Sequence, residues 1–151
     1  MKLTSLIACL FLLPFGNNSN LDLHDIIQSS DHIIMAELTD VCHNSLAGNI
    51  ISQLKGKLEM QTIDISIPSS ESSQTKSLVE EKKAILFLEH IGNNEFSLLF
   101  TLEEHLDSNG EDHYIYVDQT VPSYIKTESF INALESFIYN EQEISLENLQ
   151  P

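Results

Sequence analysis

The chain has 151 residues, and 23 Asp and Glu stand against seven Lys and no Arg, which gives a formal net charge of −16. A chain of this length forms one domain and buries roughly 68–70% of its unfolded surface, so its core needs neither a metal nor a disulfide. Affinity for nucleic acid comes mainly from cations that displace phosphate counterions. The composition therefore excludes nucleic acid as a partner, and it disfavours anionic membrane surfaces in the same way.

Residues 1–19 are predicted to be a secretory signal peptide. Lys2 supplies a positive start, an apolar run extends from Leu3 to Phe15, and the sequence then turns polar. The run is shorter than the about 20 residues that a membrane-spanning helix needs. This layout is typical of a leader cleaved on export, here near Gly16 or Ser19. We expect a secreted or periplasmic protein with no stable membrane span.

The two cysteines lie on opposite sides of the expected cleavage site, so export has a different consequence for each. Residues 6–9 (LIAC) resemble the lipobox of bacterial lipoproteins, but six more apolar residues follow Cys9, so lipid anchoring there is not expected. Export leaves Cys42 as the single cysteine, which cannot form an intramolecular disulfide. Its thiol is either buried and inert, which we expect, or paired with another molecule.

The predicted elements begin with a short helix capped by Asn20, whose apolar residues recur at helical spacing up to Ile27. A strand follows from His32 to Val41 and is apolar on both faces. Such a strand lies between a barrel interior and a covering helix. One face comprises Ile34, Ala36 and Leu38, and the other comprises Ile33, Met35 and Val41.

A second strand is predicted over about 46–54, and it ends at a Lys-Gly-Lys turn. Gly56 permits the backbone angles of a tight turn, and the lysines on either side keep its tip soluble. In the third apolar run, 58–67, the alternation changes phase after Met60. This change predicts a β-bulge near Gln61 or Thr62, and bulged strands help a short sheet to curl into a small barrel.

The second half of the domain reads as a meander followed by a helix. After a polar loop over 68–81, strands are predicted at 82–90, 95–102 and 113–117, with turns at 91–94 and at the Asn-Gly pair 109–110. Thr127 is expected to cap an amphipathic helix that packs on the barrel. The apolar face of this helix comprises Phe130, Ile131, Leu134, Phe137 and Ile138.

We therefore predict a mainly β (α+β) fold, a small OB-like antiparallel barrel of five to six strands with a short N-terminal helix and an amphipathic C-terminal helix. The barrel domain is expected over 20–139, and an acidic tail over 140–151. Segments 30–38 (SDHIIMAEL), 53–56 (QLKG) and 84–89 (AILFLE) resemble the OB-type fold of the tissue inhibitors of metalloproteinases and of exported bacterial proteins. The resemblance covers roughly residues 21–118 and implies the fold alone. In that family a free amino-terminal cysteine chelates the zinc of the protease, and this chain has no cysteine between the expected cleavage site and Cys42.

Few residues of the chain have the spacing that is typical of a catalytic, metal-binding or phosphate-binding motif. The densest groups with metal-binding side chains are 103–105 (EEH) and 112–113 (DH), and neither has the spacing of a zinc site. Segment 107–112 has its glycine at the fourth position, whereas an EF-hand loop needs it at the sixth. Cys42 and His43 are neighbours that would point to opposite faces of a strand. The carboxylate pairs 80–81 and 103–104 are expected to be solvated loop or edge charges, and five scattered glycines form no phosphate-binding loop.

We accordingly assign no catalytic, metal-binding or cofactor-binding residue from the sequence, and we expect no cofactor. The leading expectation is a non-catalytic exported binding module whose partner is an envelope or extracellular protein. One alternative is a small hydrolase or metal-dependent enzyme with a site assembled from His43, His90, His105, His113 and nearby carboxylates. The other is a protease inhibitor that uses a loop. A deep pocket where these histidines converge favours the enzyme, and a shallow face favours the binding module.

Overall fold

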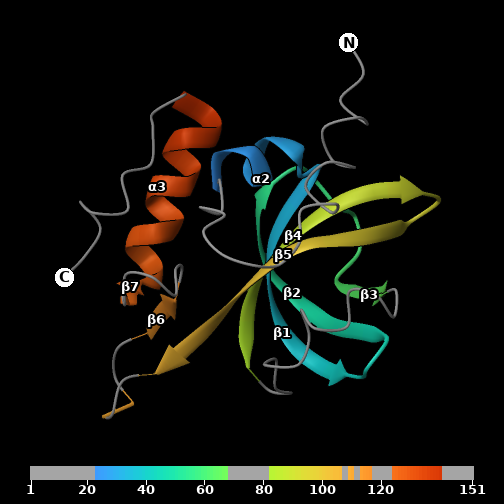
Figure 1. Ribbon diagram of the computed structural model, residues 1–151, viewed down its shortest axis with the longest axis horizontal. Coiled ribbons are helices and arrows are strands. Elements are labelled where there is room, and N and C mark those ends of the chain that lie inside the picture. The colour runs from blue at the N-terminus through green and yellow to red at the C-terminus, as the bar shows by residue number, and fades with distance from the viewer. Residues whose placement is uncertain (1–22, 68–81, 107–108, 111–112, 117–123, 141–151) are drawn as a thin grey trace, which may run out of the picture.

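The computed structural model describes residues 23–67, 82–106, 109–110, 113–116 and 124–140 (Figure 1). The expected signal peptide, the Asn20 cap, the loop over 68–81 and the acidic tail beyond residue 140 lie outside the described residues. The elements in chain order are α2 (Leu23–Ser29), β1 (His32–Val41), β2 (Ser45–Lys55), β3 (Thr62–Ser66), β4 (Lys83–Gly92), β5 (Glu95–Leu106), β6 (His113–Tyr116), β7 (Tyr124–Lys126) and α3 (Thr127–Asn140).

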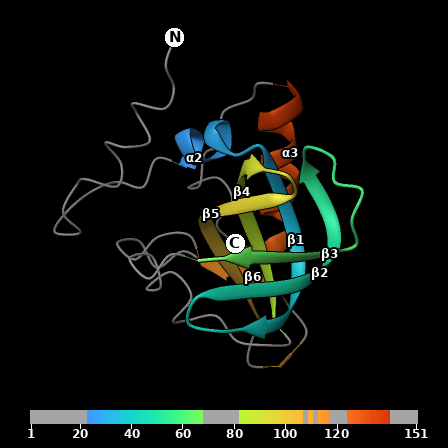
Figure 2. The same ribbon diagram turned by 90° about the vertical axis from the view of Figure 1, so that its right-hand side faces the viewer.

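The strands form one antiparallel sheet in the order β3-β2-β1-β4-β5-β6-β7, with α2 and α3 packed on one side (Figures 1 and 2). This confirms the mainly β fold with one short N-terminal helix and one C-terminal helix. The closed cylinder that the sequence predicts is wrong, because the described strands leave the sheet open. β3 contacts β5 without a hydrogen-bonded ladder between them. β3 has only five residues, and the far half of β5 turns away to pair with β6, so a complete seam does not form.

Strand β1 is the common wall of two hydrophobic layers, because its side chains alternate between the two faces of the sheet. Ile34, Ala36 and Leu38 face the interior of the curled sheet, while Ile33 faces the helices. The prediction for Val41 is wrong, since Val41 also packs against the interior. The register of β1 against β2 shifts between Leu38 and Asp40, and this irregularity reverses the alternation beyond it.

The inner cluster fills the interior of the curl, and the outer cluster lies between the sheet and the helices. The inner cluster comprises Ile34, Ala36, Leu38, Leu46, Leu58, Ile63, Ile65, Ile67, Ala84, Leu86, Leu88, Phe96 and Leu98. The outer cluster comprises Leu23, Ile26, Ile27, Ile33, Leu54, Ile85, Phe87, Leu102, Ile125, Phe130 and Leu134. Strand β4 is buried from Ala84 to Leu88 because its alternate residues serve the two clusters in turn.

The third predicted strand is shorter than expected. Regular structure begins only at Thr62, and residues 56–61 form an irregular connection, so the phase change after Met60 marks a loop and not a bulge within a strand. Strand β5 is longer than expected, and its register against β4 shifts between Phe87 and Leu88. As a result Leu98 faces the inner cluster and Leu102 faces the outer cluster. In a regular strand these two side chains, four residues apart, would lie on the same face.

Two further details differ from the sequence expectations. The hydroxyl of Thr127 is buried and makes no hydrogen bond within the described part of the chain, so Thr127 begins α3 without capping it. Cys42 is exposed and not buried, because β1 ends at Val41 and Cys42 enters the turn before β2. Its Sγ lies 3.2 Å from Oδ1 of Asp40 and donates to it.

Candidate binding cleft

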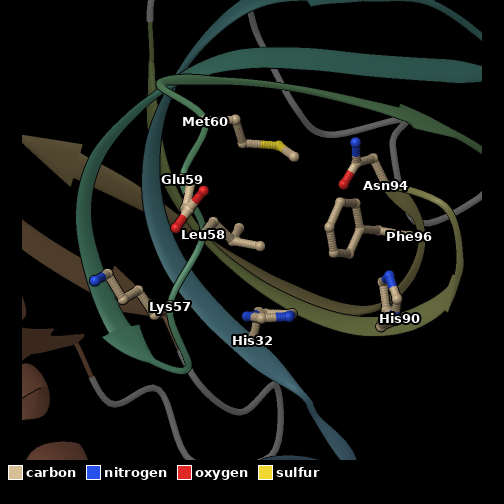
Figure 3. A pocket seen from close by; sticks show the side chains of 8 residues that line it. All are labelled: His32, Lys57, Leu58, Glu59, Met60, His90, Asn94 and Phe96. Carbon is tan, nitrogen blue, oxygen red and sulfur yellow. The ribbon is translucent and has the colours of Figure 1, made fainter.

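An open cleft of about 470 Å³ lies at the end of the curled sheet where β1 begins and β4 ends (Figure 3). One wall is the β4–β5 hairpin, and the other is the connection between β2 and β3. The first residue of β1 lies between them. The lining residues are His32, Lys57, Leu58, Glu59, Met60, His90, Asn94 and Phe96.

The hairpin wall is shaped by a two-residue turn. Asn93 and Asn94 both have positive φ, at 21° and 65°, as a type I′ turn requires. The start of β1 fastens the hairpin through Asp31. Oδ2 of Asp31 accepts a hydrogen bond from the backbone N–H of His90 at 2.8 Å, and the N–H of Asp31 donates to the carbonyl of Leu88 at 2.9 Å. Asp31 therefore fixes the hairpin against the start of β1 through two hydrogen bonds, one made by its carboxylate and one by its backbone N–H.

The loop wall is irregular in backbone and yet firmly bonded. The side-chain amide of Gln53 binds both backbone groups of Leu58: Oε1 accepts from its N–H at 2.6 Å, and Nε2 donates to its carbonyl at 2.8 Å. Farther along, the N–H of Ile50 donates to the carbonyl of Gln61 at 2.8 Å. These three bonds replace the ladder that a strand would have supplied, and they hold Leu58 and Met60 toward the interior.

His32 forms the floor of the cleft together with two neighbouring rings. Its imidazole meets the ring of Phe96 edge-on, with centroids 5.6 Å apart, and lies 6.4 Å from the ring of His90. The rings of His90 and Phe96 are 5.5 Å apart. Figure 3 shows the three side chains gathered at the lower right of the cleft, with Met60 projecting toward Phe96 from the other wall.

The connection after β2 passes directly over the His32 ring. Gly56 has a φ of +71°, and a Cβ at this position would lie 2.5 Å from Nδ1 of His32 and 2.6 Å from the carbonyl oxygen of Asp31. Glycine is needed here for both its backbone angle and its lack of a side chain. The prediction of an unusual turn conformation at Gly56 is confirmed, and the close approach to His32 gives a second reason for it.

The surroundings of His32 favour its neutral form. Burial lowers the pKa of His32 below its ordinary value, the Asp31 carboxylate raises it, and His90 and Lys55 lower it further. Nδ1 is buried and has no hydrogen-bond partner among the described residues. A second proton would place an unpartnered N–H beneath Gly56, which adds to the cost of charging the ring.

The two lysines beside Gly56 have different roles. Nζ of Lys55 donates to the carbonyl of Ile27 at 2.7 Å, which ties β2 to the last turn of α2. Burial lowers the pKa of Lys55, and Asp31 acts in the opposite direction. Lys57 is exposed, and its ammonium group points away from the three rings (Figure 3). The interior of the cleft therefore contains no lysine charge.

The cleft has few means for covalent chemistry. Its lining residues include no hydroxyl or thiol nucleophile. Asp31 accepts from the backbone of His90 and not from its ring, so this pair lacks the carboxylate–imidazole bond of an activated base. The surface that the cleft offers a ligand is mixed: Leu58 and Phe96 are almost fully buried, and most of the side chains that line the cleft are polar, among them both imidazoles and the Asn94 amide.

The histidines that the enzyme alternative needs do not converge on the cleft. His90 lines it, but His43 lies in the turn after β1, at the opposite end of a strand of ten residues, roughly 30 Å long. His105 lies near the end of β5 and His113 begins β6, at the opposite end of β5 from the hairpin that lines the cleft. Cys42 and His43 are likewise distant from the cleft.

The expectation that residues 103–104 form a solvated carboxylate pair is wrong for Glu104, which is only 8% exposed. Its Oε1 lies 2.8 Å from Nδ1 of His113, and this contact links β5 to β6. Burial raises the pKa of Glu103, while His105 and Lys82 act in the opposite direction. Within the described ranges, no group of three or more His, Cys, Asp or Glu could hold a metal ion. Glu80, Glu81 and Asp107 lie outside the described residues, as does Asp112.

The sequence analysis assigned no site residue; it named His90 only within the enzyme alternative, and it did not single out His32. The signal that could have found His32 is antiparallel pairing. The N-terminal end of one long strand then lies beside the C-terminal end of its partner, and β1 pairs His32 with Leu88, two residues before His90. The position of the 57–61 loop gives no comparable signal, because it depends on the side-chain amide of Gln53.

Comparisons with protein-family models, with curated proteins and with solved structures find no match to this chain. No helix within the described residues is long and apolar enough to cross a membrane. Any functional conclusion therefore depends on the geometry of the cleft.

Proposed function

We propose that this protein is a non-catalytic exported binding module, and that its cleft binds an envelope or extracellular protein. The observation that carries the proposal is the construction of the cleft. Two bonded walls and a floor of three rings form an open cleft of about 470 Å³ that is lined by both polar and apolar side chains. Binding sites are typically concave and largely preformed, with a few polar groups that set orientation.

The binding role is favoured over the enzyme alternative by the arrangement of the rings. His32 and His90 contact each other and Phe96, and neither ring is paired with a carboxylate by a bond in the cleft. An enzyme of the proposed kind needs a nucleophile or metal within reach of a base. Among the described loops, 57–61 gives no comparable support to inhibition of a protease, because its Leu58 and Met60 side chains face inward and Gln53 binds the backbone of Leu58.

Affinity capture from the native envelope fraction tests this function. We would use the exported chain and its His90→Trp variant, in which an indole fills the cleft from an exposed position. Ile51→Trp is the matched control, since Ile51 is 48% exposed on β2 and does not line the cleft. We expect the wild type and Ile51→Trp to retain the same protein partner and His90→Trp to lose it, at unchanged melting temperature. Equal capture by all three chains would contradict a cleft-dependent binding function.

A further inference from the structure

We propose that His32 is an acid-sensitive switch in the floor of the cleft, and that protonation turns its ring out from beneath Gly56 and into the cleft. The movement itself needs no partner, whereas its effect on binding rests on the proposed function. Three features carry the inference: the burial of one ring nitrogen, the charged groups around the ring, and the bonds that fix the backbone above and beside it.

The ring of His32 is placed to suit one protonation state. Its Nδ1 is buried beneath Gly56 and has no hydrogen-bond partner among the described residues, whereas the side chain as a whole is half-buried and lines the cleft. A neutral ring with its proton on Nε2 leaves no N–H to satisfy at Nδ1. A charged imidazole carries an N–H on both nitrogens, so in this position it would bury an unpaired donor.

The surroundings of the ring oppose a positive charge in this position. The titratable and charged groups around it are Asp31, Lys55, Lys57, Glu59 and His90. Burial lowers the pKa of His32 most, Asp31 acts in the opposite direction, and His90 and Lys55 lower the pKa further. A ring turned into the open cleft regains water as a hydrogen-bond partner and therefore binds a proton more tightly. Because the proton favours the outward position, acidification shifts the population toward it.

The backbone around the ring is fixed, so the side chain is the part that can move. Lys55 ties the strand before Gly56 to α2, and Gln53 holds the loop after it. His32 itself is paired in the ladder between β1 and β4. The cleft of about 470 Å³ has room for an imidazole ring, and Figure 3 shows the ring at the border of this space. Rotation of the side chain into the cleft therefore relieves the buried donor without moving a strand.

Outward rotation changes the floor of the cleft. The edge-on contact between His32 and Phe96, with ring centroids 5.6 Å apart, is lost. The charged ring then fills part of the space that a partner would occupy. We therefore expect the partner of the proposed function to be bound at neutral pH and released at mildly acid pH.

NMR of the exported chain between pH 7.5 and pH 5 tests the movement without a partner. At pH 7.5 the His32 ring should carry its proton on Nε2 and show an NOE to the ring of Phe96, and this NOE should be lost at pH 5. The methyl signal of Met60, which lines the cleft, should shift with the same midpoint as the His32 ring. Met35, which is 8% exposed and absent from the cleft lining, is the internal control and should not shift.

Two variants identify the histidine that is responsible. His32→Gln keeps a polar side chain that does not titrate, so the pH-dependent shift of Met60 should fall at least fivefold. His90→Gln removes the other imidazole of the cleft and should leave the size of this shift within twofold, with a higher midpoint. Affinity capture with the wild-type chain then measures the effect on binding, and we expect at least fivefold less partner at pH 5 than at pH 7.5.

The results for the switch and for the binding function are independent. An NOE to Phe96 that persists after His32 is charged, or a Met60 shift that persists in His32→Gln, would overturn the switch and leave the function intact. A Met35 shift with the same midpoint would reveal a general change of the fold and would also overturn it. If the ring moves and capture is equal at both pH values, the control of binding is wrong. If His90→Trp retains the partner at pH 7.5, the proposed function fails, and the NMR result still decides the switch.

Discussion

The two hydrophobic clusters share strands β1, β2, β4 and β5, but they differ in what covers them. The outer cluster is covered by α2 and α3, and its largest side chains, Phe87 and Phe130, are fully buried. The inner cluster has no helix over it, and at one end its Phe96 side chain forms part of the cleft floor. The comparison teaches that the two faces of one sheet can differ in use: the helix-covered face is closed and buried, and the interior is open at one end, where it borders the cleft to which we assign binding.

The outer cluster and the cleft also differ in the interactions that fix their shape. Shape in the outer cluster comes mainly from helices that lie on strands and bury large side chains, with hydrogen bonds from Lys55 and Tyr139 between helix and strand at its margin. At the cleft, shape comes from a few specific hydrogen bonds, those of Gln53 to Leu58 and of Asp31 to the hairpin. A substitution should therefore have different consequences in the two regions, and three measurements test this difference.

The largest effect is expected from Phe130→Ala in α3. Removing a fully buried phenyl group leaves a cavity in the outer cluster, and such changes cost about 3–5 kcal/mol of unfolding free energy. Chemical denaturation measures the loss, with exposed Asn132→Ala on the same helix as a control within about 0.5 kcal/mol. Below its melting temperature the variant should keep the Met60 methyl signal of the wild type. A displaced Met60 signal would show that the two regions are not separate.

A smaller effect is expected from Gly56→Ala, and Gly110→Ala provides a close control. Both glycines have a φ of +71°, but a Cβ at Gly110 would meet nothing within 4 Å, whereas one at Gly56 would strike His32 and Asp31. The backbone angle alone should cost roughly 1–2 kcal/mol in each variant. The collision should add about 1–3 kcal/mol at Gly56 and move the ring of His32. Equal losses in denaturation experiments would disprove the close packing over His32.

The smallest effect concerns pH. Because the folded pKa of His32 is lowered, the unfolded chain binds more protons at mildly acid pH, and the contribution of His32 to stability is lost as pH falls below its unfolded pKa. NMR titration of the ring should give a midpoint below about 6.5. His32→Gln should reduce the loss of stability between pH 7.5 and pH 5. A midpoint at or above the ordinary value would contradict the burial of the ring.

Local sequence patterns predicted the positions of helices and strands along the chain better than they predicted which face of the sheet each side chain occupies. The limits of β1 and the beginning of α3 follow from runs of apolar residues, and both are found where expected. Val41 and Leu102 lie on faces that simple alternation does not give, because register shifts interrupt it. These shifts depend on how neighbouring strands fit, which no single segment records.

The cleft was less predictable than the fold. His32, His90 and Met60 come from three separate segments, and only the pairing of β1 with β4 and the hydrogen bonds of Gln53 bring them together. The Lys-Gly-Lys turn did indicate an unusual backbone at Gly56. It could not indicate that the turn crosses an imidazole, because that contact requires the tertiary structure.

The unclosed seam between β3 and β5 has a mechanical consequence. Among the described strands no ladder bonds join these two edges, so the sheet can widen there at the cost of side-chain contacts alone. The 57–61 loop leads directly into β3, and the bonds of Gln53 and Ile50 tie this loop to β2. Because β3 also pairs with β2, a widening of the seam would have to move β2, β3 and the loop wall of the cleft together.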